Sequence, residues 1–137
     1  MGVYPDAQAF YTCVGGLLER VRGTVAIAQS FENSNLVVRF RCVEPDAVVT
    51  VDTRFDVNEI RYGDDDVPAD IELIMHADVA HRFWLGTTNP VAEVMAGRIA
   101  YRGSLSKLTS VLPLLRSARE LYPEHLRATG YADLLEA

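Results

Sequence analysis

The amino-acid sequence predicts an α+β fold, because strand patterns are grouped between helix patterns. Apolar residues recur every three or four positions near both ends of the chain, which is typical of helices, and every second position in the middle, which is typical of strands. The alternation predicts a sheet with one covered face and one face in water. The 137 residues, 49% of them hydrophobic, suffice for a single domain over 1–137, with a core over about 6–120 and a tail over 123–137.

Charge and cysteine usage argue against several classes of protein. The formal net charge of -6 disfavours binding to duplex nucleic acid, because that affinity depends on clustered Lys and Arg. Cys13 and Cys42 lie far apart without a CxxC pattern, so we expect both thiols to be reduced and buried. The sequence has neither a secretory signal pattern nor a run of about 18 apolar residues. We therefore expect a cytoplasmic protein with no transmembrane segment.

The first predicted element is a helix that opens at Pro5 and Asp6. Gly15 and Gly16 inside it each cost about 1 kcal/mol relative to Ala, so we expect a neighbour packed close to the backbone there. The segment 24–31 is ambiguous, and we favour a short second helix. The helical spacing of the first element rests on Phe10, Cys13, Val14, Leu17 and Val21.

Strands follow from residue 36 onward. The segments 36–43 and 47–55 alternate apolar and polar residues on either side of the turn Glu44-Pro45-Asp46, which predicts an antiparallel hairpin. A weaker strand covers about 58–62, and Ile71, Leu73 and Met75 mark a fourth. We expect these four strands to form an antiparallel meander.

The second half of the chain alternates helix signals with one strand. We expect Asp78 to cap a helix that ends at Gly86. Asn89 and Pro90 open a short helix whose inward residues are expected to be Val91, Val94 and Met95, and Gly97 closes it. A fifth strand around Ile99 and Tyr101 leads to a longer helix capped by Ser104 and kinked by Pro113. We expect only loosely attached turns after Pro123.

The sequence contains no complete catalytic motif of the GxSxG, HExxH, P-loop or dinucleotide-binding kind. His76, Asp78 and His81 could contribute to acid–base or metal chemistry, but their spacing fits no zinc pattern. We interpret Asp78 as a helix cap and both histidines as solvent-facing. The run Asp64-Asp65-Asp66 lacks the glycine and distal glutamate of a calcium loop. The sequence thus predicts no catalytic residue and no metal site.

A series of features between residues 78 and 115 is more specific. In order, the features are the acidic helix start at Asp78, Gly86, the Asn89-Pro90 turn, Met95-Ala96-Gly97, the strand at Ile99 and the turn at Gly103. This series resembles the sterol carrier protein type-two family, and the likeness in layout covers most of residues 6–120. Ser104, where many members have an acidic residue, and Pro113 depart from the family pattern and bear on the entrance of any cavity.

The resemblance implies a five-stranded, mainly antiparallel sheet covered on one face by helices, with an apolar cavity between them. The implied function is non-catalytic binding and carrying of a hydrophobic ligand, such as a fatty acyl chain, an acyl-CoA, a sterol or another lipid-like intermediate. No cofactor is implied. Each proposed lining residue could instead be plain core, and Met95 is the preferred contact because its thioether adapts to a variable neighbour. The proposed lining consists of Phe83, Trp84, Val94, Met95, Leu105, Leu108, Leu112 and Leu115.

Two other functions stay open at this point. The chain could be an accessory module of a larger enzyme system, with its cavity filled by side chains and its outer surface facing a partner enzyme. It could also be a small enzyme that acts on an enclosed hydrophobic substrate through His76, Asp78 or His81. Sequence alone defines neither the ligand nor the oligomeric state.

Overall fold

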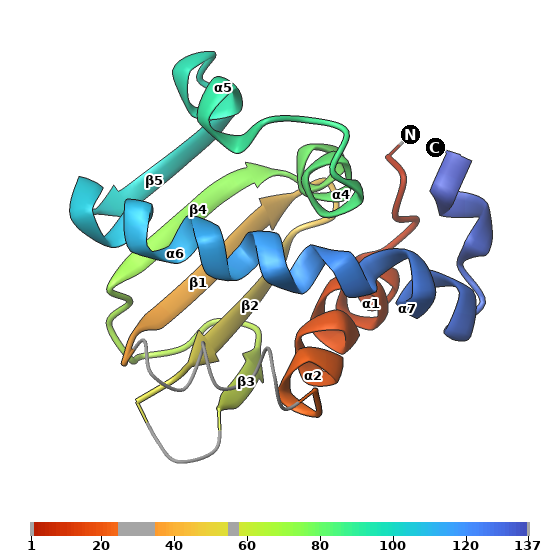
Figure 1. The fold of residues 1–137 in the computed structure, drawn as a ribbon, viewed down its shortest axis with the longest axis horizontal. Coiled ribbons are helices and arrows are strands. Elements are labelled where there is room, and N and C mark those ends of the chain that lie inside the picture. Colours follow the sequence, from red (N-terminus) through yellow and green to blue (C-terminus); the bar gives the residue numbers. More distant parts are fainter. Residues whose placement is uncertain (1, 25–34, 55–57, 137) are drawn as a thin grey trace.

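The computed structural model describes residues 2–24, 35–54 and 58–136. A five-stranded sheet in the order β3-β2-β1-β4-β5 carries helices on one face, and the long helix α6 runs across that face (Figure 1). The α+β class and the mostly antiparallel sheet agree with the sequence prediction. Residues 25–31 of the helix expected over 24–31, and the last residue of the strand expected over 47–55, lie outside the described residues.

The N-terminal helix is one continuous helical segment with a π-helical turn. The Asp6 carboxylate accepts a hydrogen bond from the backbone N–H of Ala9 and caps the helix at its start. The predicted close neighbours of the two glycines are confirmed: a Cβ built on Gly15 would lie 2.2 Å from the Tyr62 ring, and one on Gly16 would lie 2.7 Å from the His125 imidazole. The parts of this segment are α1 (Ala7–Phe10), η1 (Tyr11–Gly15) and α2 (Gly16–Arg22).

The sheet confirms the predicted hairpin and corrects the predicted meander. Strands β1 and β2 pair antiparallel, with Phe40 opposite Val49. Strand β4 does not continue from β3; it crosses to the other side of β1 and pairs with it in parallel, with Leu73 beside Phe40. Alternation shows which face a residue occupies but not which strand lies next to it. The strands are β1 (Val37–Val43), β2 (Ala47–Asp52), β3 (Glu59–Tyr62), β4 (Ile71–His76) and β5 (Ile99–Gly103).

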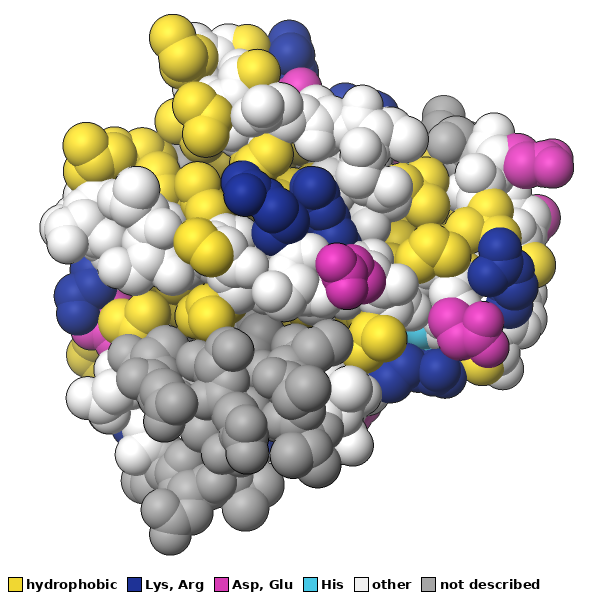
Figure 2. All heavy atoms as spheres, in the orientation of Figure 1, with side chains coloured by type: hydrophobic (Ala, Val, Ile, Leu, Met, Phe, Trp, Pro, Cys, Tyr) yellow, Lys and Arg dark blue, Asp and Glu magenta, His cyan; other side chains and the backbone are white. Residues whose placement is uncertain are grey.

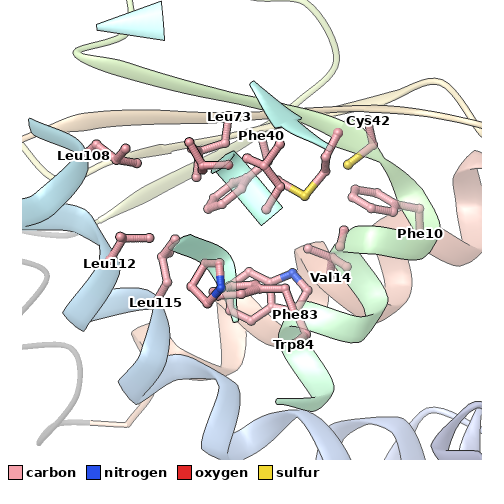
Figure 3. Close-up of a pocket in the computed structure, with 15 residues that line it drawn as sticks. Phe10, Val14, Phe40, Cys42, Leu73, Phe83, Trp84, Leu108, Leu112 and Leu115 are labelled. Carbon is pink, nitrogen blue, oxygen red and sulfur yellow. The ribbon is translucent and has the colours of Figure 1, made fainter. Parts of the chain in front are cut away.

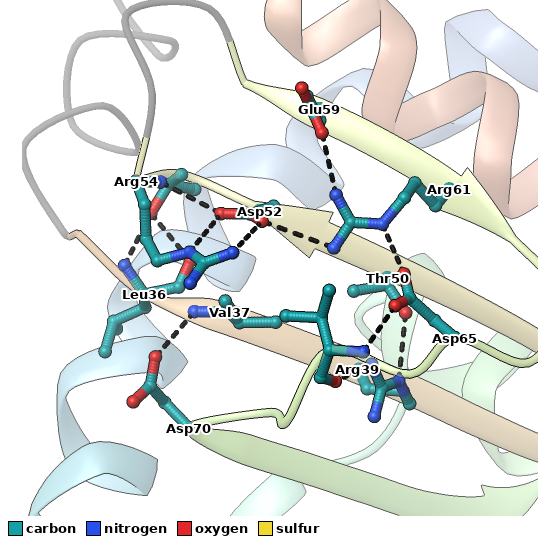
Figure 4. Close-up of polar contacts among 12 residues, drawn as sticks. Leu36, Val37, Arg39, Thr50, Asp52, Arg54, Glu59, Arg61, Asp65 and Asp70 are labelled. Atoms are coloured by element: carbon teal, nitrogen blue, oxygen red, sulfur yellow. Dashed lines mark hydrogen bonds and ion pairs between the residues drawn. The ribbon is translucent and has the colours of Figure 1, made fainter.

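The face of the sheet away from the helices is polar, as predicted, but much of it is closed off from water. Arg39 is buried there; its guanidinium donates to the Thr50 hydroxyl at 3.0 Å and to the Val67 carbonyl at 2.6 Å. Asp65 pairs with Arg61. The connection between β3 and β4, which must cross β2 and β1, therefore lies over this face (Figure 4). The same β3–β4 connection that rules out a simple meander also covers the polar face of the sheet.

A second polar contact on the same face centres on Asp52. Its buried carboxylate accepts from the guanidinium of Arg54 at 2.7 and 2.9 Å and from that of Arg61 at 3.2 Å (Figure 4). These hydrogen bonds, chiefly those from Arg54, lower the pKa of Asp52 to about 2. Asp64 forms an ion pair with Arg41 at 3.0 Å. Two residues of the aspartate run at 64–66, Asp64 and Asp65, therefore pair with arginines of the sheet.

The helices after β4 largely follow the predicted signals. Gly86, with φ of 79°, ends α4, and the side chains of Asn89 and Ser104 cap α5 and α6. One cap is corrected: His76, not Asp78, precedes α4, and its Nδ1 accepts from the backbone N–H of Asp78 at 3.1 Å. Helix α6 continues through Pro113. These helices are α4 (Ala77–Leu85), α5 (Pro90–Met95) and α6 (Leu105–Ala118).

The C-terminal tail packs into the core, which contradicts the expectation of loosely attached turns. Tyr122 and Leu126 in α7 (Tyr122–Ala128) are fully buried, and Leu134 in the 3-10 turn η3 (Ala132–Glu136) is buried as well. Helices α6 and α7 are joined by the 3-10 turn η2 (Arg119–Leu121). The two chain ends lie beside each other (Figure 1). Among the described residues, no helix is long and apolar enough to cross a membrane.

Candidate functional site

The candidate site is an apolar pocket between the helix-covered face of the sheet and helices α4, α5 and α6 (Figure 3). The N-terminal helix closes one side, and β1, β4 and β5 form the floor. All 15 lining residues are hydrophobic. They are Phe10, Val14, Phe40, Cys42, Leu73, Met75, Ala80, Phe83, Trp84, Pro90, Val94, Ile99, Leu108, Leu112 and Leu115.

Aromatic rings form one wall of the pocket. The Trp84 ring lies 4.9 Å from that of Phe83 and 6.0 Å from that of Phe40, measured between centroids, in tilted and edge-on arrangements. The Arg119 guanidinium lies 5.8 Å from the Phe83 ring centroid, where a cation is attracted by the ring's electrons. These contacts join the two aromatic residues of α4 to Phe40 of β1 and to Arg119, the first residue after α6.

The chemistry available to the lining is limited. None of the 15 residues carries an acidic or basic side chain. Cys42 supplies the only thiol, and burial raises the pKa of that thiol to about 12. A thiol with such a pKa is neutral near pH 7 and is a poor nucleophile, because the thiolate is the reactive form. The lining can exclude water and contact an apolar molecule, and it offers no acid, base or activated nucleophile.

The pocket is small in this conformation. Its volume is about 20 Å³, which is room for about one water molecule. Pockets that hold drug-sized ligands measure about 300–1,000 Å³. An acyl chain or a sterol can therefore enter only if helix and sheet move apart.

Six of the eight residues predicted to line a ligand cavity do line this pocket: Phe83, Trp84, Val94, Leu108, Leu112 and Leu115. Whether they contact a ligand stays a prediction. The other two, Met95 and Leu105, lie outside it.

Both outliers sit at the ends of their helices and face solvent. Met95 is 85% exposed and Leu105 is 67% exposed. In α5 the buried position belongs to Glu93, whose carboxylate is held by Arg98 at 2.7 Å and by the Thr88 hydroxyl at 2.7 Å. The expectation that Met95 faces inward is therefore wrong, as it is for Val91, which is 51% exposed.

The structure gives His76, Asp78 and His81 separate partners outside the pocket. His76 is partly exposed at the end of β4, as expected, and its Nε2 lies 2.9 Å from a Glu44 carboxylate oxygen. The Asp78 carboxylate accepts from the backbone N–H of Val3 at 2.7 Å. His81 is fully buried rather than solvent-facing.

The pocket also contains residues that sequence reasoning did not propose as lining. They are Phe10 and Val14 of the N-terminal helix, Ala80 of α4, Pro90 of α5, and five strand residues, Phe40, Cys42, Leu73, Met75 and Ile99. Of the strand residues, Phe40, Cys42 and Leu73 point toward the helices in Figure 3. Their inward direction was available from the strand alternation. What the sequence did not show was which strands lie under α6.

No family model matches the sequence, and no curated protein sequence does either. Solved structures do match in fold. A sterol carrier protein 2 from Yarrowia lipolytica, in its apo form, has a TM-score of 0.57 at 19% identity, covering 68% of this chain and 76% of its own. A protein from Thermus thermophilus, described as a candidate sterol carrier protein, has a TM-score of 0.66 at 11% identity, covering 90% and 91%. A ubiquinone synthesis protein, UbiJ-SCP2, has a TM-score of 0.51 at 15% identity, covering 66% and 74%. At these identities the likeness concerns the fold.

Proposed function

We propose that this chain, which has the fold of sterol carrier protein 2 domains, binds and carries a hydrophobic molecule between its sheet and helix α6. One observation carries the proposal: the pocket is lined by 15 hydrophobic residues and no charged one. Such a lining lowers the free energy of an apolar molecule that leaves water, and it offers little to hold a polar one.

The proposal is for binding without catalysis. The pocket presents no ionised group, and His76, Asp78 and His81 bond to other parts of the protein. The positions of these three residues therefore do not support a role for them in acting on a substrate enclosed in the pocket. With few polar groups to orient a ligand, selectivity depends on shape, so fatty acyl chains, acyl-CoA and sterols are all suitable ligand classes. A polar headgroup would stay outside, at the pocket's mouth.

Opening requires displacement of α6, the element that roofs the pocket. Its inner face contributes Leu108, Leu112 and Leu115, which contact the pocket only through dispersion and hydrophobic burial. Pro113 lies inside this helix and lacks a backbone N–H, so one hydrogen bond of the helix interior is missing. An acyl chain that enters replaces the apolar contacts of these leucines, which offsets the cost of moving the helix.

The test uses Trp84, the only tryptophan in the chain, as a reporter in the pocket wall. Delipidated protein is titrated with a long-chain fatty acid below its micelle concentration. Saturable quenching or shifting of Trp84 emission is expected, because the ligand replaces the indole's neighbours. No change with fatty acids, acyl-CoA or sterols would contradict the proposal.

Two adjacent positions on α5 give a matched control. Val94 lines the pocket and Met95 faces solvent. Val94→Phe fills pocket volume, so it should weaken ligand binding about tenfold or more, whereas Met95→Phe should leave binding unchanged. Neither variant adds a tryptophan, so the reporter stays unique. Equal effects of the two substitutions would place the ligand elsewhere.

A filled interior is the specific observation that favours a second function. The pocket of about 20 Å³ equally suits an accessory module that never opens and whose outer surface contacts a partner enzyme. The structural match to a ubiquinone synthesis protein supports this alternative. The same titration separates the two functions, since a permanently filled module gives no saturable Trp84 response to any lipid class.

A further inference from the structure

Exposed hydrophobic side chains gather along the edge of the molecule formed by strand β5. Helix α5 precedes this strand and helix α6 follows it, and hydrophobic side chains are exposed over α5 and over the start of α6 (Figure 2). Three large hydrophobic residues there are the most exposed: Met95 is 85% exposed, Leu105 is 67% exposed and Val91 is 51% exposed. Large exposed apolar side chains that cluster mark interaction sites more often than scattered ones do. We call these three residues the β5 rim.

The rim lies in a basic part of an acidic protein. Residues 91–119, which contain the rim, have five Lys or Arg and one acidic residue, Glu93, whereas the rest of the chain contains 8 Lys or Arg and 18 Asp or Glu. Arg98 directly precedes β5, Arg102 lies within it, and Lys107 lies in the first turn of α6. Positive charge therefore flanks the exposed apolar tips although the net charge of the chain is -6.

The carboxylates that pair with these cations are set back from the surface. The side chain of Arg98 is 56% exposed while that of its partner Glu93 is 7% exposed. The side chain of Arg102 is 79% exposed while that of Glu72 is 9% exposed. Lys107 lies 3.9 Å from an Asp70 oxygen, and both side chains are partly exposed. The charge presented outward at this edge is thus positive, with the compensating negative charge mostly beneath it.

We infer that the β5 rim docks on an anionic lipid surface. Apolar tips surrounded by Lys and Arg are the combination that binds such a surface, because the tips enter the acyl boundary while the cations stay with the headgroups. A second copy of the chain fits less well. Pairing two β5 edges would place Arg98 and Arg102 of both copies together, and charged residues on a short edge strand oppose such pairing.

Docking on an anionic lipid surface is a property separate from ligand binding, and vesicle flotation tests it. The 137-residue chain is floated with vesicles of phosphatidylcholine alone or with phosphatidylglycerol added. Binding is expected only to the anionic vesicles, and it should weaken at 1 M salt, where the Debye length falls to about 3 Å. Absence of binding to anionic vesicles at low salt overturns the inference.

Substitutions at exposed positions locate the contact without disturbing the core. Met95→Asp with Leu105→Asp, and separately Lys107→Glu, should weaken binding to anionic vesicles by about tenfold. Val43→Asp is the apolar control, since Val43 is 44% exposed at the end of β1. Arg127→Glu is the charge control, since Arg127 lies on α7. Equal loss in the controls would mean that net charge, not the rim, governs binding, and would overturn the inference.

Two further measurements distinguish membrane docking from dimer formation and from ligand binding. Sedimentation of the free protein detects a dimer; a dimer abolished by the rim substitutions, without vesicle binding, would assign the surface to a second copy and overturn the inference. The Trp84 titration with a dispersed fatty acid should be unchanged in the rim variants. Ligand binding and membrane docking can then fail independently.

Discussion

The Nδ1 atom of His81 lies 2.8 Å from the hydroxyl oxygen of Tyr122, within the core of the protein. The other ring nitrogen, Nε2, lies 2.9 Å from the Leu134 carbonyl, which can only accept, so Nε2 carries the proton and Nδ1 accepts from Tyr122. The Tyr122 hydroxyl in turn accepts from that of Tyr4 at 2.6 Å. This chain of hydrogen bonds joins both ends of the protein to α4 and lies apart from the pocket.

Tyr122→Phe should lower the free energy of unfolding by about 1–3 kcal/mol, because it leaves two buried polar groups, on His81 and Tyr4, without a partner. Chemical denaturation measures the change. Tyr131→Phe is the control, since Tyr131 lies at the edge of the core and should change stability by less than about 0.5 kcal/mol. Equal effects would show that the hydrogen-bond chain adds no stability. The Trp84 ligand response should persist in Tyr122→Phe.

Stability should fall in two stages as the solution is acidified. Burial lowers the pKa of His81 and of His125 from the ordinary 6.5, so the unfolded chain takes up protons first and stability is lost as the pH falls below about 6.5. The pKa of Asp52 is lowered to about 2 from 3.8, chiefly by hydrogen bonds from Arg54. Its contribution is present above about pH 4 and is lost as the pH falls toward 2.

Urea denaturation at pH values from 8 to 2 measures both stages. His81→Gln should reduce the slope of unfolding free energy against pH in the first stage, whatever it does to stability at pH 8. A slope that is unchanged in His81→Gln and in His125→Gln would contradict the assignment of the first stage to these two imidazoles.

Gly15→Ala should destabilise the protein by about 1–3 kcal/mol, because the new methyl group would overlap the Tyr62 ring. To avoid it, Tyr62 must leave its edge-on contact with Tyr11 and its hydrogen bond to Glu19. Gly23→Ala is the control, since the nearest atom to its Cβ is 3.6 Å away. If Tyr62→Ala does not relieve the cost of Gly15→Ala in the double variant, the collision is not its cause.

Leu108→Ala and Leu105→Ala should differ in their effects, although the two leucines are one helical turn apart on α6. Leu108 is buried in the pocket wall, so its truncation should cost about 2–5 kcal/mol. Leu105 is largely exposed, and its truncation should cost less than about 0.5 kcal/mol. Thermal unfolding compares them. Similar costs would mean that α6 lies on the sheet in another orientation.

Local signals in the sequence predicted most elements of the fold. The Asn89-Pro90 start of α5, the Ser104 cap of α6 and the end of α4 at Gly86 all depend on neighbouring residues, and all three are confirmed. The resemblance to the sterol carrier protein type-two family also implied eight lining residues, six of which line the pocket, on α4, α5 and α6.

Features that depend on distant parts of the chain were missed. Strand β4 lies on the side of β1 away from β2 and pairs with β1 in parallel, and no local pattern encodes that choice. Met95, the last residue of α5, faces outward, whereas Glu93 in the same helix is buried and its carboxylate accepts from Arg98, which follows the helix. His81 is different. It falls four residues after buried Ala77 and three before buried Trp84, so helical spacing placed it inward, and only its polarity suggested solvent.

The most direct test of the central claim locates the ligand itself. Protein with labelled methyl groups is saturated with an unlabelled long-chain fatty acid, and nuclear Overhauser contacts between ligand and protein are recorded by NMR. The pocket account predicts contacts from the acyl chain to the methyl groups of Leu108, Leu112 and Val94, which line the space between sheet and helix. Contacts confined to the exposed methyl groups of Met95 and Leu105, or no contacts at saturation, would contradict it.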